Sequence, residues 1–290
     1  YEAERLPLNP PIPRRDLFNS GYIQSLIQTT RGCPMDCEFC SVTAFNGRKY
    51  RFRPVDEIVK ELKSINRQRV FFVDDNIIGH TNASKDHAKD LFETMIREKI
   101  KVSWYSQTDM TFGKDPEMVK LAAKSGCRMV LIGFESEKAE ELKNMRKSIN
   151  TDMKLKYRKY LRNIHREGIM VMGTFIFGLD SDNVRDLYRR ARFVNRSGAD
   201  ILQLTILTPF PGTKLYYRIK DEKRIIKNNY PEDWQHYHFC EVCMQPGNMS
   251  PDDLSFNMTN VWEYLYSKKN LRKLFLKSLF RKIGRASCRE

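Results

Sequence analysis

The sequence predicts an α/β fold, a partial TIM-like (β/α)6 barrel followed by a mostly helical C-terminal extension. Three observations support this. Apolar segments of strand length alternate with segments of helical periodicity, six such strands fit between residues 22 and 219, and polar residues follow each strand. Strict alternation is typical of a parallel sheet with right-handed crossovers. A complete eight-unit barrel needs about 250 residues, so a six-unit partial barrel fits better. An open doubly wound sheet is the alternative.

The strands are predicted from short apolar runs. Residues 69–75, "RVFFVDD", form a continuous apolar run of the kind found in strands that are buried on both faces. The full set of expected strands is 22–28, 69–75, 101–107, 128–135, 169–178 and 200–207. Each is short enough to be a single strand of a small barrel.

The helices between them are predicted from spacing and from end signals. Ile58, Val59, Leu62 and Ile65 recur at helical spacing. Asp115 followed by Pro116, with Gly126 at the other end, is typical helix punctuation. The full set of expected helices is 55–65, 84–99, 115–126, 138–145, 152–168 and 183–198, with one or two amphipathic basic helices in 252–282.

The chain divides into four parts by composition. Residues 1–21 are rich in proline and charge and are interpreted as a linker or arm from an upstream domain. Residues 22–219 are the expected barrel and 220–282 the extension. Residues 283–290 can be read back into codons that resemble a sequencing adapter, so the natural sequence is expected to stop near Lys282.

Composition and charge restrict the class of protein. Hydrophobic residues make up 41% and charged residues 30%, as in globular proteins. No apolar run is long enough for a membrane-spanning helix, and the start lacks a signal-peptide pattern, so a cytoplasmic location is expected. The net charge of +15 could attract nucleic acid or an anionic membrane, but the charges are scattered, which favours a solvated surface and no nucleic-acid partner. The basic amphipathic segment 266–282 indicates either a packing helix or peripheral membrane contact.

Three of the seven cysteines fall within eight residues, in the pattern C-x3-C-x2-C. They are Cys33, Cys37 and Cys40, and thiolates of this kind suit an iron–sulfur cluster or zinc. Structural zinc takes four protein ligands, and the other paired cysteines, Cys240 and Cys243, lie about 200 residues away. A cluster held by three thiolates leaves one metal position open, which is a property of catalytic sites. The missing ligand is therefore expected to be a substrate or cofactor.

Polar residues collect where the expected strands end, which is where parallel α/β folds place their sites. Turns are polar in most proteins, and this explains some of these residues. It explains less well the cysteines after the first strand and the acidic residues after the second and fourth strands. The residues concerned are Gln28, Thr29, Asp74, Asp75, Asn76, Ser106, Gln107, Asp109, Glu135, Ser136, Gly178, Asp180, Asp182 and Thr208.

Together these motifs resemble the radical S-adenosylmethionine (SAM) superfamily. The segments "IQTTRGCPMDCEFCSV", "FFVDDN", "IGFES", "FIFGLDSD" and "LTPFPGT" resemble, more narrowly, its cobalamin-binding-domain-containing members, which include hopanoid-modifying and ring-cyclase-like proteins. The resemblance implies that Cys33, Cys37 and Cys40 hold a [4Fe–4S] cluster whose fourth iron chelates SAM. It also implies reductive cleavage of SAM to a 5′-deoxyadenosyl radical, and an electron donor such as flavodoxin or ferredoxin.

The resemblance also implies a set of SAM-binding residues. Asp74–Asp75–Asn76 occupy the place of the superfamily's Gly-Gly-Glu, so the acidic character is kept and the glycines are not. The adenine motif matches in part, since Thr174 and Ser181 stand at its usual flanking positions. The complete set of expected cofactor-binding residues is Phe39, Asp74, Asp75, Asn76, Gln107, Glu135, Ser136, Ile176 and Gly178. No catalytic residue beyond these is predicted.

The predicted function is that of a radical SAM enzyme that acts as a cobalamin-dependent methyltransferase. Its expected substrate is a small molecule or lipid, either lipid-like or tetrapyrrole-like. Cobalamin would be bound by the full-length parent only. Two alternatives stay open: an RNA-modifying radical SAM methylthiotransferase, and a metal-stabilised, basic nucleic-acid-binding module.

Overall fold

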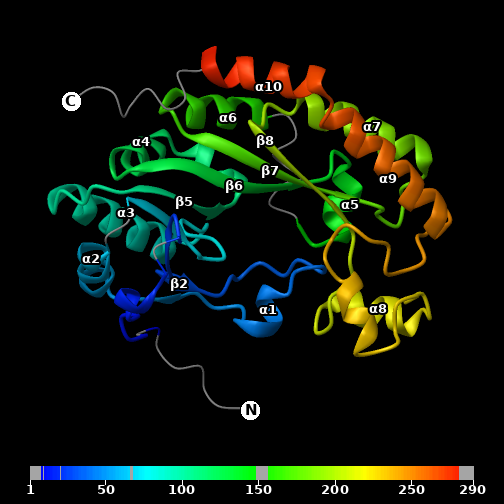
Figure 1. The fold of residues 1–290 in the computed structure, drawn as a ribbon, viewed down its shortest axis with the longest axis horizontal. Helices are drawn as coiled ribbons and strands as arrows, with labels where there is room; N and C mark the ends of the chain where they lie inside the picture. Colours follow the sequence, from blue (N-terminus) through cyan, green and yellow to red (C-terminus); the bar gives the residue numbers. More distant parts are fainter. Residues whose placement is uncertain (1–7, 9, 20, 66–67, 148–155, 281–290) are drawn as a thin grey trace.

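The computed structural model describes residues 8, 10–19, 21–65, 68–147 and 156–280. Six parallel strands form one sheet in the order β1-β4-β5-β6-β7-β8 (Figure 1). Their bounds are β1 Ser25–Ile27, β4 Arg69–Phe72, β5 Ser103–Thr108, β6 Cys127–Glu135, β7 Met170–Phe177 and β8 Ile201–Ile206. The order follows the chain without a reversal, whereas a doubly wound sheet reverses at a switch point. The partial barrel is therefore confirmed and the doubly wound alternative is wrong.

Every helix expected between the strands is present. The outer helices α4, α6 and α7 lie along one side of the curved sheet, and the chain around α1 and α8 lies on the other (Figure 1). The helices expected from the sequence are α2 Val55–Ser64, α3 Asn82–Arg97, α4 Pro116–Lys124, α5 Ala139–Asn144, α6 Tyr157–Arg166 and α7 Val184–Arg196. Residues 152–155 of the fifth expected helix lie outside the described residues.

The end signals of α4 act as the sequence predicted. The side chain of Asp115 accepts a hydrogen bond from the backbone N–H of Met118 at 3.1 Å, which satisfies a free donor of the first turn. Gly126 has a φ of +107°, and a Cβ there would lie 2.1 Å from the carbonyl oxygen of Val102. Only glycine combines this backbone conformation with so close an approach.

Several short elements were not predicted. They are η1 Arg15–Leu17, β2 Thr30–Arg31, α1 Val42–Phe45, β3 Arg51–Phe52, η2 Met110–Lys114, α8 Lys214–Asp221 and η4 Glu232–His236. The most informative are β2 and β3, which pair antiparallel and close the two ends of the cysteine loop. Strands of two residues carry no periodicity that sequence reasoning can use.

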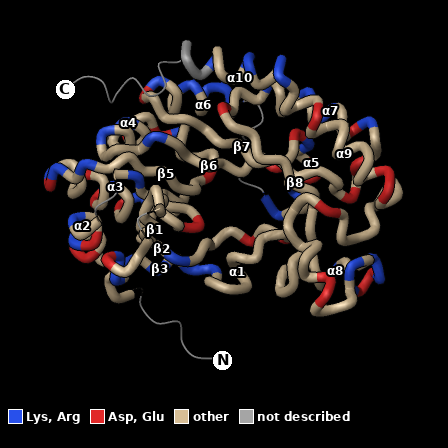
Figure 2. The backbone as a smooth tube through the Cα atoms, in the orientation of Figure 1, with Lys and Arg blue, Asp and Glu red and all other residues tan. Residues whose placement is uncertain are grey.

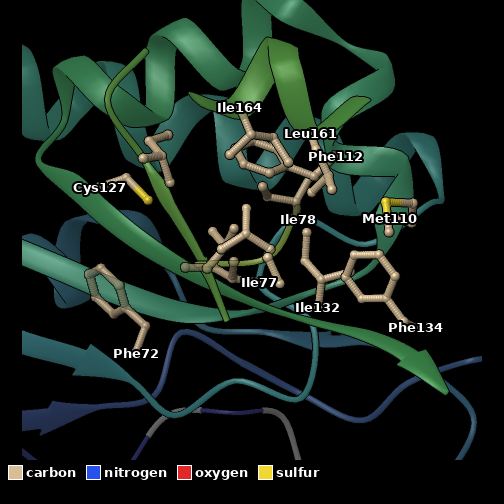
Figure 3. Close-up of a cluster of buried hydrophobic side chains, with 14 of the residues drawn as sticks. Phe72, Ile77, Ile78, Met110, Phe112, Cys127, Ile132, Phe134, Leu161 and Ile164 are labelled. Atoms are coloured by element: carbon tan, nitrogen blue, oxygen red, sulfur yellow. The ribbon is translucent and has the colours of Figure 1, made fainter. Parts of the chain in front are cut away.

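The core fills the space between the sheet and the outer helices. Trp104 is fully buried, stacks on Phe92 at 5.1 Å between ring centroids, and meets the edge of Phe72 at 5.3 Å. Figure 3 shows part of the same apolar cluster, in which Cys127 lies among aliphatic and aromatic side chains. Its thiol is a small buried hydrophobe, and burial raises its pKa.

The C-terminal part of the described chain is helical, with α9 Pro251–Leu265 and α10 Lys268–Phe280. Leu254, Met258, Val261 and Leu265 of α9 are buried in the same hydrophobic cluster as the barrel. Helix α8 runs across residues 219 and 220, where the boundary of the extension was predicted, so that division stays a prediction. Residues 283–290, which were expected to be a sequencing adapter, lie outside the described residues. None of the described helices is both long and apolar enough to cross a membrane.

Candidate functional site

A cavity of about 370 Å³ lies at the C-terminal ends of the strands, and all three clustered cysteines line it. Six of the nine predicted cofactor-binding residues line it as well: Phe39, Asp75, Asn76, Gln107, Glu135 and Ile176. The remaining three, Asp74, Ser136 and Gly178, are not among the lining residues. The topology thus brings most of the predicted site together from five segments of the chain.

The cysteine loop is held in shape by its own backbone. Gly32 enters it with a φ of +94°, and a Cβ there would lie 2.4 Å from the carbonyl oxygen of Lys49. The N–H of Cys33 donates to the carbonyl of Gly47 at 3.3 Å, and that of Cys40 to the carbonyl of Cys37 at 3.2 Å. The loop therefore closes on itself and turns its three thiols toward one cavity.

The three thiols form a suitable donor set for an iron–sulfur cluster. Burial raises the pKa of Cys37 to about 11 and raises those of Cys33 and Cys40, so the free thiols are protonated and give up their protons when metal binds. In a cluster each thiolate binds a different iron, so the sulfurs need not surround one point. Indeed, within the described residues no group of three or more His, Cys, Asp or Glu is arranged to hold a metal ion.

Asp75 connects the end of β4 to the cysteine loop. Its Oδ2 accepts hydrogen bonds from the backbone N–H of Gly32 at 2.9 Å and from Nδ2 of Asn46 at 3.1 Å. Asn76 beside it donates to Asp109 at 2.7 Å, and both of these residues line the cavity. The carboxylates of Asp75 and Asp109 therefore face a potential ligand while fixed by neighbours on three loops.

Asp74 points away from the cavity and holds the end of β1. It is fully buried, and its Oδ1 accepts from the N–H groups of Thr29 and Thr30 at 2.7 and 2.8 Å. Burial raises its pKa to about 7, although these hydrogen bonds act in the opposite direction. The geometry favours a structural task for Asp74 and a ligand-facing task for Asp75.

The raised pKa of Asp74 predicts a pH-dependent stability. An unfolded aspartate titrates near pH 3.9, so between about pH 4 and 7 the native state binds more protons than the unfolded state. The free energy of unfolding is then expected to fall with rising pH, with a slope approaching about 1.4 kcal/mol per pH unit from this group. Urea unfolding at several pH values, with Asp74→Asn as the variant that lacks the titration, measures it. Equal pH slopes for both proteins would contradict the assignment.

Glu135 and Lys147 form an ion pair inside the cavity. Lys147 Nζ lies 3.2 Å from Glu135 Oε1, and the side chains are 16% and 7% exposed. Glu135 ends β6 at a register shift and has a φ of +62°, a strained conformation that functional sites often hold. A Cβ on Gly133 would lie 2.1 Å from Glu135 Oε1 and 3.2 Å from Lys147 Nζ, so the glycine makes room for the pair. Burial alone would lower the pKa of Lys147, but Glu135, together with Cys37 and Asp109, outweighs it and raises that pKa.

Lys147 was not predicted from the sequence. It lies three residues after the end of α5, and no strand end or motif marks it. The backbone N–H of Glu38 donates to the carbonyl of Met145 at 3.0 Å, which brings this segment against the cysteine loop. The sequence feature that could have indicated a lysine here is Glu135 at the end of an expected strand, because a buried carboxylate needs a cationic partner.

Ser136 does not line the cavity and is held by a buried arginine. Arg190 of α7 is fully buried and donates to Ser136 Oγ at 3.2 Å, to Glu137 Oε2 at 2.8 Å and to Asp182 Oδ1 at 2.8 Å. It also donates to the carbonyl of Ile176 at 3.0 Å. One side chain thus joins the ends of β6 and β7 beneath two predicted site residues.

Gly178 is placed by packing against the C-terminal extension. Its φ is +75°, and a Cβ would lie 2.6 Å from Cδ2 of Leu254, which is 1% exposed. Because Leu254 is enclosed by the core, it has little freedom to move aside. Packing against Leu254 therefore explains why residue 178 is a glycine, independently of any bound cofactor.

Replacing Gly178 with alanine is expected to lower the free energy of unfolding by about 1–3 kcal/mol. Gly212→Ala is the matched control, since Gly212 has a similar φ of +84° but its nearest atom to an added Cβ, in Ala44, is 3.5 Å away. The difference between the two variants in urea unfolding isolates the contact with Leu254. Equal losses would show that backbone conformation alone accounts for the effect.

The far wall of the cavity comes from β8 and the chain that follows. Its residues were not predicted as ligand-binding: Gln203, Thr205, Phe210 and Phe239, among others. Phe210 and Phe239 lie 4.8 Å apart between ring centroids, and the N–H of Ile206 donates to the carbonyl of Phe239 at 2.7 Å. The C-terminal extension therefore contributes one aromatic residue, Phe239, to the lining of the cavity.

Comparison with known proteins agrees with this geometry. Residues 27–194, more than half of the chain, match the family model described as the Radical SAM superfamily. The chain is 29% identical over 253 residues to bacteriochlorophyllide d C-12(1)-methyltransferase of Chlorobaculum tepidum, covering 85% of this chain and 52% of that protein. It is 30% identical over 227 residues to hopanoid C-2 methylase of Rhodopseudomonas palustris, covering 77% and 43%. The chain thus spans about half the length of these relatives.

Solved structures share the fold. TsrM from Kitasatospora setae, a radical SAM methyltransferase solved with tryptophan substrate and a SAM analogue, superposes with a TM-score of 0.71 at 18% identity, covering 85% of this chain and 53% of that one. The cobalamin-dependent SAM radical enzyme OxsB gives a TM-score of 0.51 at 18% identity, covering 82% and 35%. At these identities the likeness shows the fold alone.

Proposed function

The chain belongs to the radical SAM superfamily, and we propose that it is the catalytic barrel of an enzyme that cleaves SAM reductively. The observation that carries the proposal is the convergence of Cys33, Cys37 and Cys40 on one cavity with Asp75, Glu135 and Lys147. A tri-thiolate wall with fixed polar groups opposite suits a cluster with one open iron. A bound [4Fe–4S] cluster and SAM supply a one-electron reduction that releases methionine and a 5′-deoxyadenosyl radical.

In this proposal each residue of the chain has a defined task. The thiols of Cys33, Cys37 and Cys40 would hold the cluster, and Phe39 and Ile176 would pack against the adenosyl group. Three carboxylates and one ammonium line the cavity in the described residues, namely Asp75, Asp109, Glu135 and Lys147. Their net negative charge is complementary to the cationic sulfonium of SAM. Asn76 and Gln107 offer amides for the polar edges of the same ligand.

The substrate and setting are part of the proposal. The aromatic lining residues Phe210 and Phe239 support a lipid-like or tetrapyrrole-like small molecule, and the relatives' names support methyl transfer. Cobalamin would be held by the full-length parent, as in the solved neighbours TsrM and OxsB. We place the enzyme in the cytoplasm, with flavodoxin or ferredoxin as electron donor and no nucleic-acid partner. Peripheral membrane contact through α10 is supported by its exposed Leu271 and Phe275 among lysines.

Anaerobic reconstitution tests the proposed activity. The protein is loaded with iron and sulfide, mixed with SAM and dithionite, and the products are analysed by mass spectrometry. We expect a brown protein that releases 5′-deoxyadenosine only when cluster, SAM and reductant are all present. A brown protein without this product, or a colourless protein that retains zinc, would overturn the proposal.

A further inference from the structure

The outer side of the cysteine loop carries a group of exposed cations. Asp36, which directly precedes Cys37, is 21% exposed and is approached by three basic side chains from three separate segments. Arg146 Nη1 lies 3.0 Å from Oδ2 of Asp36, Lys214 Nζ donates to the same oxygen, and Arg48 Nη1 lies 3.8 Å from Oδ1. We call Arg48, Arg146 and Lys214 the Asp36 collar.

The collar has more positive charge than Asp36 can neutralise. Its three side chains are 59%, 58% and 48% exposed, so their charges act on the solvent and on anything that approaches. Neighbouring cations do have local partners: Arg218 bonds Glu38 and Asp180, and Arg224 bonds Asp180. Among the described residues of this region, the collar therefore carries positive charge that its acidic partner Asp36 does not neutralise.

The surrounding surface has further features of a protein interface. Phe45, at the end of α1 between Cys40 and Arg48, is 75% exposed. Exposed aromatic residues beside arginines are enriched at protein–protein contacts. Figure 2 shows basic positions along the chain between α1 and β3. An acidic partner with an apolar centre would match both properties.

The backbone of the collar is held in place, because each of the three segments that supply it is bonded to the cysteine loop; beside Arg48, the N–H of Cys33 donates to the carbonyl of Gly47 at 3.3 Å. Glu38 N–H donates to the carbonyl of Met145 at 3.0 Å, beside Arg146. Leu215 N–H donates to the carbonyl of Glu38 at 3.0 Å, beside Lys214. A preorganised surface of this kind loses little entropy when a partner binds.

We propose that the Asp36 collar, with Phe45, is the docking site for an acidic one-electron carrier protein. This inference rests on the proposed function, in which each reductive cleavage of SAM consumes one electron from outside. The carrier is oxidised by one electron and the cysteine-bound site is reduced by one, with no group transfer between them. Asp36 is adjacent to Cys37, so a carrier seated on the collar is separated from a metal ligand by a single residue.

The position of the collar distinguishes it from the other basic surface of the molecule. Helix α10 has five lysines and arginines and no acidic residue. However, α10 lies at the opposite edge of the molecule from α1 and α8 in Figure 1. Charge there cannot guide a carrier to the cysteine loop, and this makes α10 a suitable control surface.

The test compares two triple variants of the reconstituted protein. The collar variant is Arg48→Gln/Arg146→Gln/Lys214→Gln, and the control is Lys268→Gln/Lys269→Gln/Arg272→Gln on α10, which removes the same number of charges. The probe is purified flavodoxin reduced to its hydroquinone, and its oxidation by the protein is followed by stopped flow at several salt concentrations. We expect the collar variant to react about tenfold or more slowly at low salt and to lose most of its salt dependence. The control should stay within about twofold of the unmodified protein.

SAM cleavage driven by dithionite separates this inference from the proposed function, because a small reductant needs no docking surface. We expect it to be unchanged in both variants. If the unmodified protein fails with dithionite, the proposed function fails. If dithionite works and the collar variant reacts with flavodoxin as fast as the control does, the docking site is overturned.

A second pair of variants covers the case in which the collar triple disturbs the loop. Arg48→Gln removes the collar residue that lies farthest from Asp36, and Phe45→Ser removes only an exposed ring. Each is expected to slow the flavodoxin reaction several-fold while iron content and the dithionite reaction stay at the unmodified level. Unchanged flavodoxin rates in both would equally overturn the docking site.

Discussion

Replacing Cys33, Cys37 and Cys40 together with alanine is expected to give a colourless protein that releases no 5′-deoxyadenosine. The three thiols line one cavity and come from one loop, so no other described cysteine can take their place. Alanine cannot ligate iron, and the open-iron arrangement needs all three thiolates. Iron and sulfide analysis after anaerobic reconstitution, followed by mass spectrometry of the reaction with SAM and dithionite, measures both losses.

The matched control removes the same number of thiols elsewhere. Cys127 and Cys243 are buried and Cys240 is exposed, and none of them lines the cavity. The Cys127→Ala/Cys240→Ala/Cys243→Ala variant is expected to keep its cluster and its SAM cleavage, with a small loss of stability from the two buried positions. A cluster retained by the first variant, or lost by the control alone, would show that the ligands have been misassigned.

The barrel was predictable because its evidence is local and repeated. Each strand and helix shows its own periodicity, and end signals such as Asp115 with Gly126 mark the boundaries independently of the rest of the chain. Strand ends of a parallel sheet meet at one edge, so the positions of Asp75, Asn76, Gln107 and Glu135 followed from the strand assignments alone. The structure places all four on the cavity.

What could not be predicted depends on contacts between distant segments. Asp74 and Asp75 are adjacent and chemically identical, yet one binds the end of β1 and the other faces the cavity, because successive residues at a strand end point in opposite directions. Lys147 reaches Glu135 only because the chain after α5 returns to the cysteine loop. Such pairings carry no periodicity and need the folded topology.

Arg190 supports the site from beneath, and replacing it with methionine is expected to lower the free energy of unfolding by about 3–5 kcal/mol. The side chains of Arg190 and Asp182 are both completely buried. Asp182 Oδ2 also accepts a hydrogen bond from the N–H of Leu179 at 3.0 Å. Without the guanidinium, Asp182 and Glu137 become buried charges with too little compensation. Domains are typically stable by about 5–15 kcal/mol, so this loss is a large part of the total.

Urea unfolding of three variants tests this explanation. Arg189→Met is the control one residue away, because Arg189 is 62% exposed and its ion pair with Asp186 should contribute less than about 1 kcal/mol. Adding Asp182→Asn to Arg190→Met is expected to restore part of the loss, since it removes the uncompensated carboxylate. A loss in Arg190→Met no greater than in Arg189→Met would contradict the assignment. Failure of the double variant to recover would mean that the bonds of Arg190 to Ser136 and to the Ile176 carbonyl, rather than its charge, join the ends of β6 and β7.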